Sequence, residues 1–241
     1  MMAIWKLSSN GKLDYIKKIE VIWVHESSGI NIFETMTFDE LLDIINEYPK
    51  FSMSSNTTLS DIEKLDEGNY IINEFPSISL IEQLPYYMNC NGEILFLKIN
   101  DLWVMNVSKN DYSYYSAELM PILKDGVSVK FNIHSHPNND KNINVGVPSI
   151  NDLRYGNSSN KLAYIIHDKG VLEYDLSSVE NIDKDELYII WSKLRSSNEK
   201  FKDMNEFEFQ NLFCDAIGLK RRNMSFEEFY EMCNQKDFLK K

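Results

Sequence analysis

The chain has few cysteines, the residues whose disulfides stabilise small secreted proteins. Its 241 residues include only three cysteines, Cys90, Cys214 and Cys233, which lie far apart and form no C-x-x-C pair. This spacing excludes a disulfide framework and a structural zinc knuckle, and it predicts a protein of the reducing cytoplasm. A chain of this length buries enough apolar surface to form a core without such staples.

Long apolar runs and an excess of positive charge are also missing. Lys6, Ser8 and Ser9 interrupt the apolar N-terminus, and no later run approaches the roughly 20 residues that cross a bilayer, so we expect a soluble protein that is not exported. Aspartate and glutamate number 37 against 25 lysines and arginines, for a formal net charge of −12. A field of this sign repels polyanions, which excludes broad binding to nucleic acid or anionic membranes.

Turn-rich stretches divide the chain into three predicted segments. These are an accessory α/β unit at 1–77, a central domain at 78–178 and a mostly helical extension at 179–241. The polar, turn-rich composition of 50–77 places the first boundary. Strand and helix patterns are both present along the chain, so the predicted fold class is α+β.

Hydrophobic periodicity predicts the individual elements. In the accessory unit, strands are expected at 19–24 and 30–38 and a helix at 38–49. In the central domain, the patterns predict a helix from 78 that Pro85 interrupts, strands at 93–99, 102–107 and 127–133, short helices at 116–124 and after Pro148, and a hairpin across Asp168-Lys169-Gly170.

The segment FNIHSHPNNDKNINVGVPSIND at 131–152 carries the strongest chemical signal. Apolar residues alternate with polar ones up to Ile133, which is typical of a strand with one buried face. Residues i and i+2 of a strand project to the same side, so the imidazoles of His134 and His136 can converge on one point. Such a pair can chelate a metal, but it can also be an ordinary polar face of a strand.

Ser149 and Asp152 extend this signal. A Ser-x-x-Asp before an apolar helix is a capping box, in which the serine caps the helix and the acid bonds back to the serine. The same carboxylate, in the first helical turn, can also point toward the strand and complete a site of two histidines and one acid with an open fourth position. The two interpretations do not exclude each other. The other histidines, His25 and His167, lack metal-binding spacing and are expected to be structural.

Taken together, H-S-H-P and P-S-x-x-D resemble the motif of the JAB/MPN metalloprotease family, also called JAMM. His134, Ser135, His136, Pro137, Ser149 and Asp152 match this motif position by position. The resemblance covers about 78–176, and it departs from the family in spacing, because the loop before Ser149 is about five residues longer than usual. Surface loops absorb insertions at little cost in closure entropy.

The resemblance implies a role for each of these residues. His134, His136 and Asp152 would bind zinc, Ser149 would stabilise the oxyanion, and a glutamate on an earlier strand would act as the base. By order along the chain this glutamate is Glu93, with Glu82 and Glu118 as the competing choices. The family fold is α+β, with a central mixed sheet flanked by helices.

The activity that the resemblance implies is zinc-dependent hydrolysis of a peptide or isopeptide bond. Its substrate would be a peptide or protein, and the family suggests ubiquitin-like modifiers, peptide tails and cell-wall peptides as candidates. Nothing in the sequence identifies an oligomeric state.

Other interpretations stay open at this point. A JAB-like domain can serve as a scaffold or binding module without turnover. A cupin also has a His-x-His motif, and Asp140 and Gly146 lie near the places of its acid and glycine, but Pro137 interrupts the strand that this fold needs. An amidohydrolase barrel is excluded because too little chain follows His136 to build it.

Overall fold

The structure is a computed structural model, and it describes most of the central and C-terminal parts of the chain. The described residues are 2–7, 13–19, 42–43, 45–87, 93–99, 102–109, 129–136, 146–155, 162–179 and 181–234. The strand predicted at 30–38, the helix predicted at 116–124, Cys90, Pro137 and Asp140 lie outside them.

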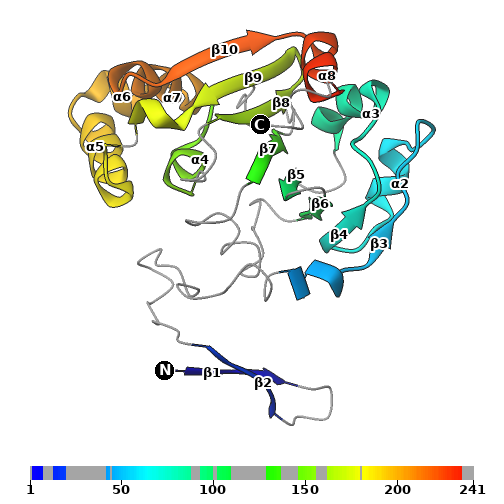
Figure 1. Ribbon diagram of the computed structural model, residues 1–241. Coiled ribbons are helices and arrows are strands. Elements are labelled where there is room, and N and C mark those ends of the chain that lie inside the picture. Colours follow the sequence, from blue (N-terminus) through cyan, green and yellow to red (C-terminus); the bar gives the residue numbers. More distant parts are fainter. Residues whose placement is uncertain are drawn as a thin grey trace.

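Eight of the described strands form one mixed sheet (Figure 1). Their order across the sheet is β10 (Lys220–Met224), β9 (Gly170–Asp175), β8 (Leu162–His167), β7 (Val129–Ser135), β5 (Ile94–Ile99), β6 (Leu102–Val107), β4 (Gly68–Ile72) and β3 (Lys50–Phe51). The pairs β7–β8 and β3–β4 are parallel, and the other neighbours are antiparallel. This mixed α/β architecture is compatible with the predicted α+β class.

The central strands are those that the apolar runs predict. All six residues of β5 are buried, as are five of the six in β6 and in β8. Strands buried on both faces have continuous apolar runs, so their positions are readable from sequence. The hairpin predicted across residues 168–170 is confirmed as β8 and β9.

Helices cover both faces of the sheet. One face packs under α2 (Leu59–Glu63), α3 (Ile78–Gln83) and α8 (Phe226–Asn234), and the other packs under α4 (Ile150–Tyr155), α5 (Lys184–Ser196) and α7 (Glu206–Ala216). Figure 1 shows these two groups of helices on different sides of the molecule. The short α6 (Glu199–Asp203) buries none of its residues.

Alternation along β8 shows how the two cores are separated. Tyr164 and Ile166 belong to the core beneath α3 and α8, whereas Ala163 and Ile165 belong to the core beneath α4, α5 and α7. Successive side chains of a strand point to opposite faces, so one strand contributes to both cores. A side chain on β7 that lies on the same face as Ile165 therefore faces α4.

The predicted interruption at Pro85 is also observed. Helix α3 gives way to a 3₁₀ turn, Leu84–Tyr86, that contains this proline. Ser77 caps the start of α3 by accepting a hydrogen bond from the Leu80 backbone N–H at 3.3 Å. Proline lacks an amide hydrogen and cannot continue the α-helical ladder.

Two parts of the fold differ from the sequence prediction. The extension at 179–241 was expected to be mostly helical, and its described residues hold α5, α6, α7 and α8, but they also include Lys220–Met224, which forms the unpredicted edge strand β10. Its charged side chains give it no apolar alternation; Arg222, for example, pairs with Glu173 at 3.3 Å and with Glu228 at 3.2 Å. Charged edge strands form because pairing comes from the neighbouring strand, here β9, and their charges discourage further pairing.

The second difference is an N-terminal hairpin. Strands β1 (Met2–Leu7) and β2 (Leu13–Ile19) pair antiparallel as a separate two-stranded sheet. Of the strand predicted at 19–24, only Ile19 is described, and it ends β2. The three-segment division of the chain stays a prediction, although the eight-stranded sheet takes strands from each of the three segments.

The two described cysteines form no disulfide, and no described helix could span a membrane. Cys214 and Cys233 are free and buried, and burial raises the pKa of the Cys214 thiol to about 12. Both are therefore unreactive core residues at neutral pH. Among the described helices, none has both the length and the apolar character that a bilayer crossing requires.

Candidate metal centre

His134 and His136 lie at the C-terminal end of β7, near the middle of the sheet. His134 pairs with Leu95 of β5 and with Ile165 of β8, which fixes its place in the sheet. The His136 backbone N–H donates to the Ile166 carbonyl at 2.9 Å, so the strand remains anchored through the second histidine. Both imidazoles are on the α4 face, and only 2% and 5% of these residues is exposed.

Asp152 reaches the same point from the first turn of α4. The Ser149 backbone N–H donates to Asp152 Oδ2 at 2.6 Å, and the Asp152 N–H donates to Ser149 Oγ at 3.1 Å. This reciprocal pair is a capping box, one of the two roles predicted for these residues. The capping bonds also hold the carboxylate in one orientation, with 11% of the side chain exposed.

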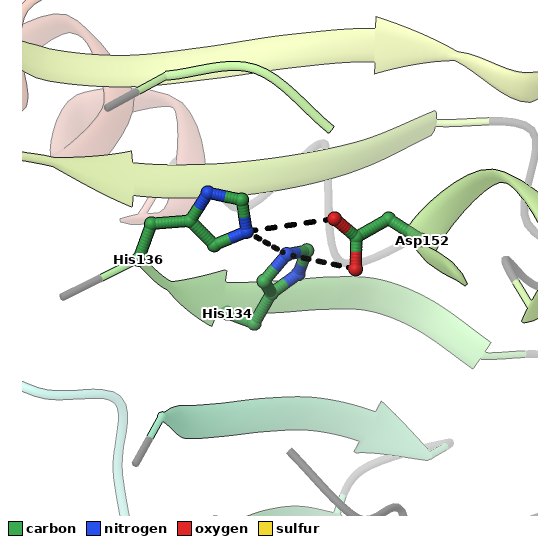
Figure 2. Close-up of side chains that lie close together, drawn as sticks. All are labelled: His134, His136 and Asp152. Atoms are coloured by element: carbon green, nitrogen blue, oxygen red, sulfur yellow. Dashed lines mark hydrogen bonds and ion pairs between the residues drawn. The ribbon is translucent and has the colours of Figure 1, made fainter. Parts of the chain in front are cut away.

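The three side chains converge (Figure 2). His134 Nε2 and His136 Nε2 are 3.1 Å apart, and each lies 3.5 Å from a different carboxylate oxygen of Asp152. In a tetrahedral zinc site with ligand bonds near 2.0–2.1 Å, neighbouring ligand atoms are about 3.3 Å apart. The measured separations lie on either side of this value, so the group has the dimensions to hold one metal ion.

The charge of the site suits a cation. Burial acts to raise the pKa of Asp152, but attraction to His134 and hydrogen bonds from both imidazoles hold this pKa well below its usual range. The carboxylate is therefore ionised at neutral pH. An ionised carboxylate beside two convergent imidazole nitrogens is a typical ligand set for a divalent metal.

Glu93 lies next to this group in the sheet. Because Leu95 pairs with His134 in an antiparallel register, continuing the pairing by two residues sets Glu93 opposite His136, on the same face. Glu93 is partly buried, and its Oε2 is buried with no hydrogen-bond partner in the described part of the chain. The competing Glu82 is exposed on α3, which packs on the other face of the sheet, and Glu118 lies outside the described residues.

Sequence reasoning missed the part played by Ser135, the residue between the histidines. Its hydroxyl oxygen accepts a hydrogen bond from the Ile94 backbone N–H at 3.0 Å, across 41 positions of sequence. The Glu93 carbonyl accepts from the Ser108 N–H at 3.0 Å. These two bonds fix the start of β5, and thus the backbone of Glu93, against the strand end that carries the histidines.

His167 supports the segment that leads into α4. Its ring is buried, and burial acts to lower its pKa, so it is neutral at neutral pH. Gly146, at φ +74°, lies so close that a Cβ there would be 2.9 Å from His167 Cδ2 and Nε2. The surroundings of His167 fit the structural role expected for it, because its ring packs against Gly146, just before Val147 and Ser149.

We expect Gly146→Ala to destabilise the protein more than Gly218→Ala does. Both glycines have φ +74°, but a Cβ at Gly218 would meet nothing within 4 Å. The control thus reports backbone strain alone, about 1–2 kcal/mol, whereas Gly146→Ala adds the collision with His167. Urea unfolding of the two variants measures the difference. An equal or smaller loss at Gly146 would show that the contact with His167 is not tight.

Comparisons with known proteins identify no relative. No protein-family model matches the chain, and neither the curated proteins nor the solved structures give a significant match.

Proposed function

We propose that this protein is a zinc-dependent hydrolase of the JAMM type that cleaves peptide or isopeptide bonds. The observation that supports this most directly is the convergence of His134 Nε2, His136 Nε2 and the Asp152 carboxylate within 4.8 Å of one another. Three protein ligands leave a tetrahedral ion one position for water or substrate, as catalytic zinc sites require. The H-S-H-P and P-S-x-x-D motifs support the same proposal.

Each chain residue has a task in such a reaction. His134, His136 and Asp152 would hold the zinc ion, which when bound would supply Lewis acidity and lower the pKa of water toward neutrality. Glu93 takes a proton from the attacking water and returns it to the leaving nitrogen. Its buried Oε2 has no hydrogen-bond partner among the described residues, which suits it to this exchange. A general base must lie within hydrogen-bond reach of its proton, and the position opposite His136 supports Glu93 over Glu82.

Ser149 is suited to stabilise the oxyanion of the transition state. Its oxygen accepts the hydrogen bond from the Asp152 N–H, which leaves the hydroxyl proton available for donation. The capping box fixes the serine beside the metal ligand Asp152. An oriented donor of this kind is worth about 100-fold or more in rate.

The open sheet does not favour the cupin alternative. The described strands end at two edges, β10 and β3, and helices cover both faces. The remaining alternative is a JAB-like scaffold that binds without turnover. Glu93 distinguishes the two, because a scaffold has no use for a buried carboxylate oxygen without a partner.

Chelator-sensitive cleavage tests the proposal. The full chain, purified without chelator, is incubated with two kinds of model substrate. One is a pair of ubiquitin-like proteins joined by an isopeptide bond, and the other is a peptide. We expect hydrolysis that a strong chelator abolishes and stoichiometric zinc restores. Stoichiometric zinc without hydrolysis of any substrate would favour the scaffold. Two histidines and one carboxylate also suit non-haem iron, so stoichiometric iron in place of zinc would contradict the zinc-dependent reaction proposed here.

A further inference from the structure

Besides Glu93 Oε2, two further buried polar atoms near the metal centre have no hydrogen-bond partner among the described residues. They are His134 Nδ1 and the Asn132 side-chain oxygen Oδ1. Asn132 is 1% exposed and His134 is 2% exposed, so bulk water cannot supply the missing hydrogen bonds. Buried polar groups are nearly always hydrogen-bonded, and an exception calls for an explanation.

The two residues are neighbours on one face of β7. They stand two positions apart, and pair with Leu97 and Leu95 of β5, respectively. Side chains at i and i+2 of a strand lie on the same side. The two atoms do not bond each other directly, and one buried water between them would give each a partner. Asn132 therefore lies directly behind His134, on the side away from His136.

Their chemistry is complementary when a metal is bound. His134 directs Nε2 toward Asp152 and His136, so Nε2 is the nitrogen that would bind the metal. A neutral imidazole that ligates through Nε2 carries its proton on Nδ1, which is then a donor. Asn132 Oδ1 is an acceptor. Histidine ligands in metal sites usually donate this second N–H to an oxygen, and that bond fixes the ring and its tautomer.

We propose that Asn132 is a positioning residue of the metal centre. Its Oδ1 accepts the Nδ1 proton of His134 across one buried water, and this bridge holds Nε2 ready for the metal. This inference rests on the metal-binding part of the proposed function. It does not require that the protein cleave any bond.

Zinc affinity measured by competition with a chromophoric chelator tests the assignment. Asn132→Leu keeps the approximate volume but removes the acceptor, and we expect about 10–100-fold weaker zinc binding. Asn132→Asp keeps an acceptor oxygen, and its affinity should be within about threefold of the wild type or tighter. Asn106→Leu is the matched control: Asn106 is also buried, with 4% exposed, but its amide donates to Asn69 Oδ1 at 2.7 Å, so zinc affinity should not change.

Two results would overturn the proposal. One is zinc binding by Asn132→Leu as tight as that of the wild type. The other is an equal loss in Asn132→Asp, which would assign the effect to packing. If the wild type binds no zinc, the proposed function itself fails, and this outcome is distinct from both.

A second measurement needs no variant. Proton–nitrogen correlation spectra of the zinc-loaded wild type should show the His134 proton on Nδ1, protected from exchange with solvent. A rapidly exchanging proton, or ligation through Nδ1, would contradict a water-mediated hydrogen bond to Asn132.

Discussion

Replacing Asp152 with alanine is expected to abolish stoichiometric zinc binding, and His136→Ala should do the same. Both side chains carry candidate ligand atoms, at separations of 3.1–3.5 Å within the group. Losing either leaves two ligands, too few for a zinc site with an open position. Elemental analysis of each purified variant, with circular dichroism to verify the fold, measures the effect. Full zinc in both variants would remove these residues from the site.

The helix cap requires its own control. Asp152→Ala also removes the acid of the capping box, and we expect a cost of about 1 kcal/mol from that alone. Asp61 has the same capping role on α2, where its Oδ2 accepts from the Thr58 N–H at 3.0 Å. Asp61→Ala should therefore cost similar stability while retaining zinc. Zinc loss in Asp61→Ala would mean that general destabilisation, and not ligand loss, empties the site.

Glu93→Gln should reduce hydrolysis by about 100- to 10,000-fold, because the amide cannot accept and return a proton. Zinc content should stay stoichiometric, since Glu93 is not one of the three convergent side chains. Single-turnover assays with saturating substrate, paired with elemental analysis, separate the loss of chemistry from the loss of metal. The amide has nearly the same size as the carboxylate, so packing is preserved.

Glu82→Gln is the matched control for this experiment. Glu82 is exposed on α3, which packs on the face of the sheet opposite α4. Its variant should cleave substrate at the wild-type rate. If Glu82→Gln were inactive and Glu93→Gln active, the base would be misassigned and the register argument for Glu93 would fail.

The sequence is most informative where burial alone decides the structure. The runs of β5, β6 and β8 are apolar because both faces of these strands are covered, and they were predicted closely. β10 is different: Lys220, Arg221 and Arg222 carry no hydrophobic pattern, and the strand exists because β9 offers a partner. Pairing with a distant segment leaves no local periodicity to read.

Local sequence patterns also predicted the three convergent side chains of the candidate site, but not the contacts around them. Strand alternation placed His134 and His136 on one side, and the serine-acid spacing predicted both the cap and the direction of Asp152. The bond from the Ile94 N–H to Ser135 joins residues 41 positions apart. The missing hydrogen-bond partners of Asn132 Oδ1 and His134 Nδ1 matter only because both atoms are buried. Neither is encoded in a local pattern, so they required the structure.

Anomalous diffraction at the zinc edge, from crystals of the full chain purified without chelator, tests the metal centre most directly. We expect one strong peak, about 2.0–2.2 Å from His134 Nε2, His136 Nε2 and an oxygen of Asp152. A zinc-loaded crystal without density at this position, or with Asp152 turned into solvent, would contradict this expectation.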